Sequence, residues 1–72
     1  MCTEMLVKRG SEDIYCNTVG ELAEALHLRP IEVSPIEDKD SCLFSVRLDD
    51  LKARKATPDE GWPFPDYIIE AD

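Results

Sequence analysis

The stretch TVGELAEALHL, residues 18–28, predicts one short amphipathic helix. Thr18 is followed three residues later by Glu21, the capping-box pattern in which each side chain accepts a hydrogen bond from a backbone N–H at the helix start. Apolar residues then recur at the spacing of one helix face: Val19, Leu22, Ala23 and Leu26. Arg29 and Pro30 predict a basic last turn and a stop. Since a helix of about three turns is marginal alone in water, its apolar stripe needs a sheet to pack on.

Two strands are expected before this helix. Residues 3–9 (TEMLVKR) and 13–17 (DIYCN) each alternate apolar and polar side chains, as half-buried strands do. The segment Gly10-Ser11-Glu12 between them has turn chemistry, because glycine adopts positive φ without steric cost. The two strands therefore predict a β-hairpin that leads directly into the helix.

A second hairpin is expected after the helix. Residues 31–36 (IEVSPI) and 42–48 (CLFSVRL) alternate in the same way, joined by the polar residues 37–41. The later strand would place these side chains on one face: Cys42, Phe44, Val46 and Leu48. Pro35 has no N–H to donate, so the earlier strand is expected to be short or at a sheet edge.

The last third of the chain carries weaker signals. Residues 49–56 (DDLKARKA) predict a short second helix with Asp49 as its cap and Leu51 as its one firm apolar anchor. Residues 57–61 have turn chemistry, and residues 67–70 (YIIE) predict a final short strand.

Together these elements predict one small α+β domain over residues 1–72, with an antiparallel sheet of four to five strands in the order β-β-α-β-β. The helix is expected to cover one face of the sheet, which buries both apolar surfaces. A chain of 72 residues forms one domain with a thin core, because it buries only about 60% of its unfolded surface.

Charge narrows the classes of partner. Sixteen acidic residues against eight basic ones give a net charge of −8, which repels phosphate backbones and anionic membranes. We therefore expect no direct nucleic-acid or membrane binding, and a protein partner with a basic surface. The sequence has no apolar run long enough to cross a bilayer and no signal-peptide pattern, so a cytoplasmic location is expected.

Residues 18–30 (TVGELAEALHLRP) resemble the first helix of a helix-turn-helix or winged-helix DNA-binding unit. That resemblance implies a recognition helix directly after the turn. Residues 31–40 (IEVSPIEDKD) instead carry a central proline and four acids against one base, a charge that phosphates repel. We therefore expect no DNA-binding function.

No motif identifies a catalytic or metal site. The only histidine, His27, has no nucleophile motif to serve, so we expect no enzyme and no catalytic residue. The acids of residues 37–40 lack the regular spacing of a calcium loop, and no cofactor or metal is expected. The cysteines at positions 2, 16 and 42 are an odd number at wide spacing, which does not predict a disulfide framework; Cys16 and Cys42 are expected to be buried small hydrophobes.

The function hypothesis rests on exposed acids and aromatics. We expect a non-enzymatic protein-binding module, an inhibitor or regulator that docks an acidic surface on a basic, nucleic-acid-binding surface of a host protein. In strategy, though not in sequence, this resembles the nucleic-acid mimics among small phage or mobile-element anti-defence proteins, such as those that inhibit CRISPR complexes. The candidate acids are Glu37, Asp38, Asp40, Asp59, Glu60 and Asp66, with Trp62 and Phe64 as apolar anchors.

Two alternatives stay open from the sequence. Trp62 and Phe64 could fold back and close the end of a thin core instead of contacting a partner. The protein could also be a homodimeric structural or accessory subunit of a larger assembly, whose charge serves only solubility.

Overall fold

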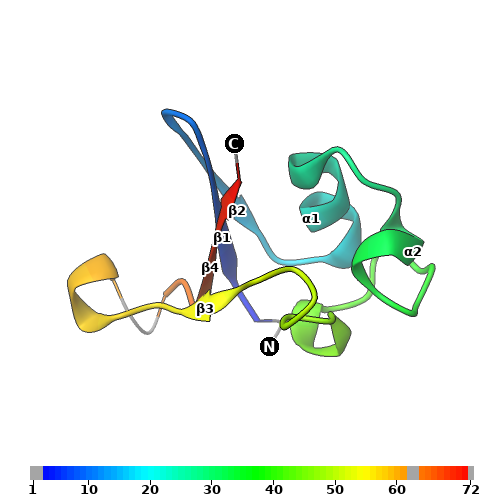
Figure 1. The fold of residues 1–72 in the computed structure, drawn as a ribbon. Helices are drawn as coiled ribbons and strands as arrows, with labels where there is room; N and C mark the ends of the chain where they lie inside the picture. Colours follow the sequence, from blue (N-terminus) through cyan, green and yellow to red (C-terminus); the bar gives the residue numbers. More distant parts are fainter. Residues whose placement is uncertain (1–2, 62–63, 72) are drawn as a thin grey trace.

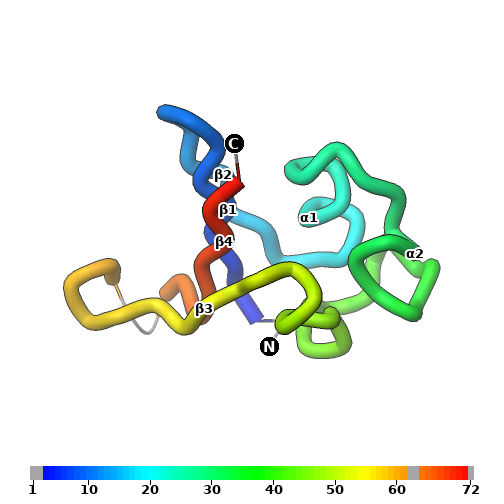
Figure 2. Tube along the Cα trace, in the orientation of Figure 1, coloured from blue at the N-terminus to red at the C-terminus, as the bar shows by residue number. Residues whose placement is uncertain are grey.

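The computed structural model describes residues 3–61 and 64–71 and shows a small α+β domain. Its strands are β1 (Met5–Arg9), β2 (Glu12–Cys16), β3 (Arg54–Lys55) and β4 (Tyr67–Ala71). Its helical elements are α1 (Val19–Leu26), the single turn α2 (Pro30–Val33) and the 3₁₀ turns η1 (Leu43–Ser45) and η2 (Pro58–Glu60). Figures 1 and 2 show α1 and α2 on one side of the sheet and the segment after β3 on the other.

The sheet is mixed, so the predicted all-antiparallel sheet is wrong. The four strands lie in the order β2-β1-β4-β3, within the predicted number. β1 pairs with β2 in antiparallel fashion and with β4 in parallel, and β3 pairs antiparallel with β4. Parallel pairing arises because the last strand enters the sheet beside the first one, after a long connection that returns the chain to the starting end of β1.

The first hairpin is confirmed. Gly10 has φ 60° and is the first residue of a two-residue turn, the position at which a type II′ hairpin turn needs glycine. The register runs from Met5 opposite Cys16 to Arg9 opposite Glu12. In this register, alternate side chains of β2 point toward α1, and the others point to the opposite face of the sheet.

The amphipathic helix is also confirmed, although it is shorter than predicted. Thr18 Oγ1 accepts a hydrogen bond from the Glu21 N–H at 3.2 Å, and Glu21 Oε1 accepts one from the Asn17 N–H at 3.2 Å. The helix ends at His27, which is left-handed with φ 57°, so the expected basic last turn does not form. Its fully buried face consists of Val19, Leu22, Ala23 and Ala25, with Leu26 half-buried.

The core lies between the sheet and the helical segments. Met5, Val7 and Ile69 supply the sheet side of it. The helical side comes from these buried residues: Val19, Leu22, Val33, Leu43 and Val46. A smaller cluster on the opposite face consists of Leu6, Ile68 and Ala56, so the two central strands are apolar on both faces.

The second predicted hairpin does not exist. Residues 30–33 form the helical turn α2, in which Glu32 Oε2 accepts a hydrogen bond from the Arg29 N–H at 2.7 Å. Residues 43–45 form η1, which buries Leu43 and turns Phe44 out to 78% exposure. Leu43 and Val46 are both buried because apolar residues three apart share a face of a helical turn.

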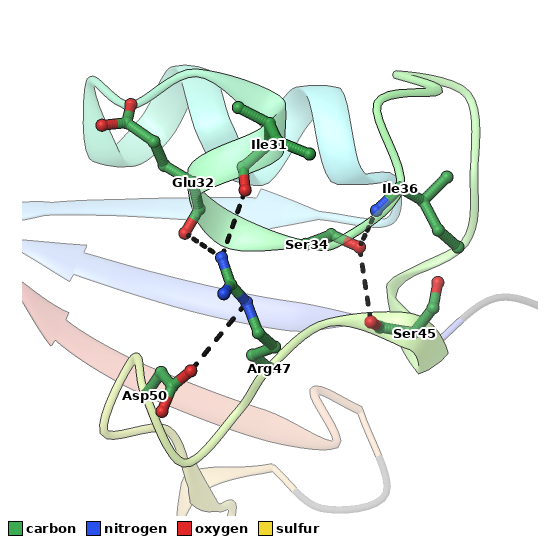
Figure 3. A network of polar contacts seen from close by, with 7 residues as sticks. All are labelled: Ile31, Glu32, Ser34, Ile36, Ser45, Arg47 and Asp50. Atoms are coloured by element: carbon green, nitrogen blue, oxygen red, sulfur yellow. Dashed lines mark hydrogen bonds and ion pairs between the residues drawn. The ribbon is translucent and has the colours of Figure 1, made fainter.

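Side-chain hydrogen bonds connect α2 to the η1 segment where a strand ladder was expected. Figure 3 shows Arg47 donating from Nη2 to the carbonyls of Ile31 and Glu32, at 3.1 and 3.0 Å. In the same network, the buried Ser34 hydroxyl donates to the Ser45 carbonyl at 3.3 Å and accepts from the Ile36 N–H at 3.2 Å. These side chains hydrogen-bond to backbone carbonyl and N–H groups that have no partner in a β-ladder.

The predicted second helix at residues 49–56 is also wrong. The chain turns at residues 49–52, with Lys52 at φ 58°, and then forms the two-residue strand β3. Leu51 and Ala53 pack against the main core, while the buried Ala56 joins the smaller cluster. The final strand is confirmed as β4.

Candidate protein-binding surface

The predicted binding residues fall into two separate groups. One lies in residues 37–40, the loop between α2 and η1; the other lies in residues 59–66, around η2. Figure 1 shows these loops on opposite sides of the sheet. The described members are Glu37, Asp38 and Asp40 in the first group, and Asp59, Glu60, Phe64 and Asp66 in the second. Trp62 lies outside the described residues.

Asp66 is part of the fold's own hydrogen bonding. Its carboxylate accepts a hydrogen bond from the Glu4 N–H at 3.0 Å, and its own N–H donates to the Glu4 carbonyl at 2.9 Å. Its carbonyl accepts from the Ala56 N–H at 3.0 Å. Asp66 therefore holds together the beginnings of β1 and β4 and the end of β3.

Glu60 also has an internal partner. Both of its carboxylate oxygens accept hydrogen bonds from the Arg54 guanidinium, each at 2.6 Å, and the Thr57 N–H donates to Oε1 at 3.1 Å. The Arg54 hydrogen bonds, followed by the Thr57 N–H, lower the pKa of Glu60 to about 2. A carboxylate already paired with an arginine offers little to a basic partner.

Asp59 and Phe64 are the members of the second group that face solvent. Asp59 is exposed and makes no ion pair or side-chain hydrogen bond with the described residues. Phe64 is 59% exposed, so the alternative in which it closes the core is wrong for this residue.

The loop at residues 37–40 is anchored through its backbone. The Lys39 carbonyl accepts a hydrogen bond from the Gly20 N–H at 2.9 Å, and the Ser41 carbonyl accepts one from the Val19 N–H at 2.9 Å. These bonds satisfy two of the N–H groups that the first turn of a helix leaves without helical partners. The loop is therefore held against the start of α1.

Two acids of this loop project freely. Asp38 Oδ1 accepts a hydrogen bond from the Asp40 N–H at 2.9 Å, which stabilises the bend. Glu37 and Asp40 are exposed, and their carboxylates have no hydrogen-bond or ion-pair partner among residues 3–61 and 64–71. The side chains of Glu37 and Asp40 are thus available for contact with another molecule.

Three exposed aliphatic residues lie near these acids, Leu28 and Ile31 beside shared hollows and Ile36 as the chain neighbour of Glu37. Leu28, Ile31 and Ile36 are 39%, 39% and 38% exposed. Ile31 and Glu37 line one shallow hollow, and Leu28 and Asp40 line a second; Pro30 and Lys39 line both, so the hollows adjoin. We define the α1–α2 surface by its projecting side chains: Leu28, Ile31, Ile36, Glu37 and Asp40.

One signal could have revealed this surface. Pro30 followed by Glu32 places proline at the first position of a helix and a carboxylate at the third, a helix-start pattern. A helical turn here predicts that Ile31 and Val33 do not share a face. The structure shows this difference: Val33 is fully buried and Ile31 is exposed.

The cysteines and the histidine have structural environments. Burial, and to a lesser degree the charge of Glu21, raises the pKa of Cys16 to about 11, so this thiol stays protonated and unreactive. Cys42 is only half-buried and is disulfide-bonded, so the expectation of a buried small hydrophobe holds for Cys16 and is wrong for Cys42. Arg9 Nη1 donates to a ring nitrogen of His27 and to the Ala25 carbonyl, so His27 has a structural contact at the end of α1.

Residues 3–61 and 64–71 contain no group of three histidine, cysteine, aspartate or glutamate side chains placed to hold a metal ion. Within the same residues, none of the helices has the length and apolar character needed to cross a bilayer.

Comparisons with known proteins give this chain no relative: no family model, no curated protein and no solved structure matches it.

Proposed function

We propose that the protein is a protein-binding module, acting as an inhibitor or regulator, whose α1–α2 surface docks on a basic surface of its partner. The observation that carries the proposal is the adjacency of exposed aliphatic and unpaired acidic side chains on one anchored surface. Protein interfaces commonly combine an apolar centre with a polar rim in this way.

The two kinds of side chain have different roles in this proposal. Burial of Leu28 and Ile31 against a partner supplies affinity, at about 25 cal/mol per Å² of apolar area removed from water. Glu37 and Asp40 supply charge complementarity, which speeds association and orients the partner more than it tightens binding. The net charge of −8 extends the same field over the whole molecule and favours a partner surface that otherwise binds nucleic acid.

The structure of the loop adds a further reason for placing the site here. Its backbone is fixed to α1 through Lys39 and Ser41, so Glu37 and Asp40 are held in position before binding. Preorganised side chains lose less conformational entropy when a complex forms.

The test is affinity capture from a lysate of the source or host cell, with wild-type protein and the double variant Glu37→Lys/Asp40→Lys. We expect the wild type to capture a basic protein, the double variant to lose it, and added duplex nucleic acid to compete. Added salt should weaken the capture, because exposed charges are screened.

Asp59→Lys is the control for a single charge reversal, at an exposed acid in the other loop, and is compared with Glu37→Lys and Asp40→Lys made singly as well as with the double variant. Its capture should equal that of the wild type. Loss with Asp59→Lys and retention with the double variant would place the site around η2 and refute the proposal. A further variant, Ile31→Ser, removes an exposed apolar side chain from the same surface. Capture that survives this variant and both charge reversals would leave the α1–α2 surface without a binding role.

A further inference from the structure

A second candidate surface is the exposed edge of β2, which lies at the other edge of the sheet from β3. β2 is an edge strand, paired with β1 on one side only within the described residues. Because Gly10 and Ser11 form a two-residue turn, the pair Arg9 and Glu12 exchanges both backbone hydrogen bonds, and bonded and non-bonded pairs alternate from there. The N–H and C=O groups of Asp13 and Tyr15 therefore point away from β1.

These outward groups are not used by the rest of the described chain. The backbones of Asp13 and Tyr15 make no hydrogen bond to any turn, loop or helix among residues 3–61 and 64–71. Edge strands of this kind are a ready template for another extended segment.

A groove lies between β2 and α1 beside this edge. It has a volume of about 350 Å³ and is bounded by Ile14 and Tyr15 of β2 and by Glu21, Glu24 and Ala25 of α1. Ile14 and Tyr15 are consecutive residues whose side chains point to opposite faces of the sheet. Since Tyr15 borders the groove together with Ile14, the groove between the hairpin and α1 reaches the β2 edge at these two residues.

Charge indicates what the groove accepts. Its rim carries the exposed acids Glu21 and Glu24 on α1, and Glu12 and Asp13 extend the acidic character along β2. Arg9 is the basic residue that borders it, and its guanidinium is already bonded to the Ala25 carbonyl and to His27. The two acids Glu21 and Glu24 outnumber this one base, so an extended segment placed here would meet a net negative charge on the α1 side.

We propose that the β2 edge binds an extended basic segment of a protein partner by strand addition. Asp13 and Tyr15 form main-chain hydrogen bonds to the segment, Ile14 and Tyr15 contact its apolar side chains, and Glu24 attracts its lysine or arginine side chains. A second copy of this chain is disfavoured because it would bring the acids of two rims together along one seam. Glu21 and Glu24 border both this edge and the hollow that Leu28 and Asp40 line, whereas Ile14 and Tyr15 border only the groove beside β2. The proposal therefore rests on the β2 backbone and does not need the α1–α2 surface to bind.

The test uses a synthetic probe, an acetylated and amidated peptide of alternating lysine and valine, about six residues long as strands usually are. Titration into ¹⁵N-labelled protein should shift the amide signals of Asp13 and Tyr15 and slow their hydrogen exchange. The same peptide methylated on alternate backbone nitrogens should not bind, because it cannot complete the ladder. A glutamate–valine peptide should not bind, because the rim repels it.

Two variants and a control make the test specific. Tyr15→Pro removes an outward N–H at an edge position that tolerates proline, and should abolish peptide binding while circular dichroism shows an intact fold. Glu24→Lys changes an exposed charge without touching the backbone and should weaken the peptide affinity about three- to tenfold. Asp59→Lys, beyond the other sheet edge, should bind as the wild type does.

Three results would overturn the proposal. The first is equal binding of the glutamate–valine peptide, and the second is a set of amide shifts that excludes Asp13 and Tyr15. The third is protection of those amides that rises with protein concentration in the absence of peptide, since it would assign the edge to self-association.

Discussion

Substitution of Asp66 tests the structure directly. The sequence predicts that Asp66 contacts a partner, whereas in the structure its carboxylate accepts a hydrogen bond from the Glu4 N–H. Asp66→Ala removes the acceptor for the Glu4 N–H and leaves the two backbone hydrogen bonds of residue 66 in place. A hydrogen bond to a charged acceptor contributes about 1.5–3 kcal/mol. Because Asp66 is only half-buried and water can reach the vacated N–H, we expect a loss of about 1–2 kcal/mol.

That loss is large for a chain of this size, whose total stability should be about 4–11 kcal/mol. With an m-value of about 1 kcal/mol/M, the urea midpoint followed by circular dichroism at 222 nm should fall by about 1–2 M. Asp66→Asn keeps an acceptor oxygen and should lose about half as much. Asp59→Ala, which breaks no contact with the described residues, should stay within about 0.5 kcal/mol. The reasoning is refuted if Asp66→Ala and Asp59→Ala unfold at the same urea concentration.

Three further predictions concern α1 and the β3–η2 segment. Leu22→Ala should cost about 2–5 kcal/mol of unfolding free energy because Leu22 is fully buried, and a thermal midpoint within 2 °C of wild type would contradict this. Gly20→Ala should destabilise although alanine favours helices, since its Cβ would lie 2.9 Å from the Lys39 Cβ; higher stability in urea would show that the loop yields. Glu60 has a pKa lowered to about 2, so its contribution is present above its ordinary pKa of 4.5 and is lost as the pH falls through about 2. Wild type should thus lose more stability than Glu60→Gln over that interval, and parallel pH profiles would exclude the Arg54 pair as the cause.

Elements fixed by a few neighbouring residues could be predicted from the sequence. The helix start depends on Thr18 and Glu21, three residues apart, and the hairpin turn depends on Gly10. Each signal involves residues at most three positions apart, so both elements can be predicted without knowing any contact between distant parts of the chain.

Residues 42–48 could not be predicted, because their pattern fits two structures. Alternation places Phe44 and Val46 on one strand face, whereas a helical turn places Leu43 and Val46 together. The structure adopts the second arrangement, which buries Leu43 in the main core. Packing against the rest of the core outweighs the β propensity of this segment.

The candidate site was predictable only in part. The acidity and exposure of Glu37 and Asp40 follow from composition and loop position. The internal use of Asp66 does not, because its partner Glu4 is 62 residues away in the chain. The apolar half of the surface does not follow from the sequence, because the alternation of residues 31–36 predicts a strand, which would place Ile31 and Val33 on the same face.

The parallel pairing of β1 with β4 has a consequence for how the chain is synthesised. The central pair of the sheet joins residues near the first and last positions of this sequence, with Leu6 beside Ile68 and Val7 beside Ile69. A nascent chain that has not yet released β4 from the ribosome lacks one of the two central strands, and the edge of β1 that pairs with β4 is then unpaired. The amphipathic helix and the first hairpin involve only local contacts and can form early. Because the main core includes Ile69, we expect the domain to close only after β4 has been translated.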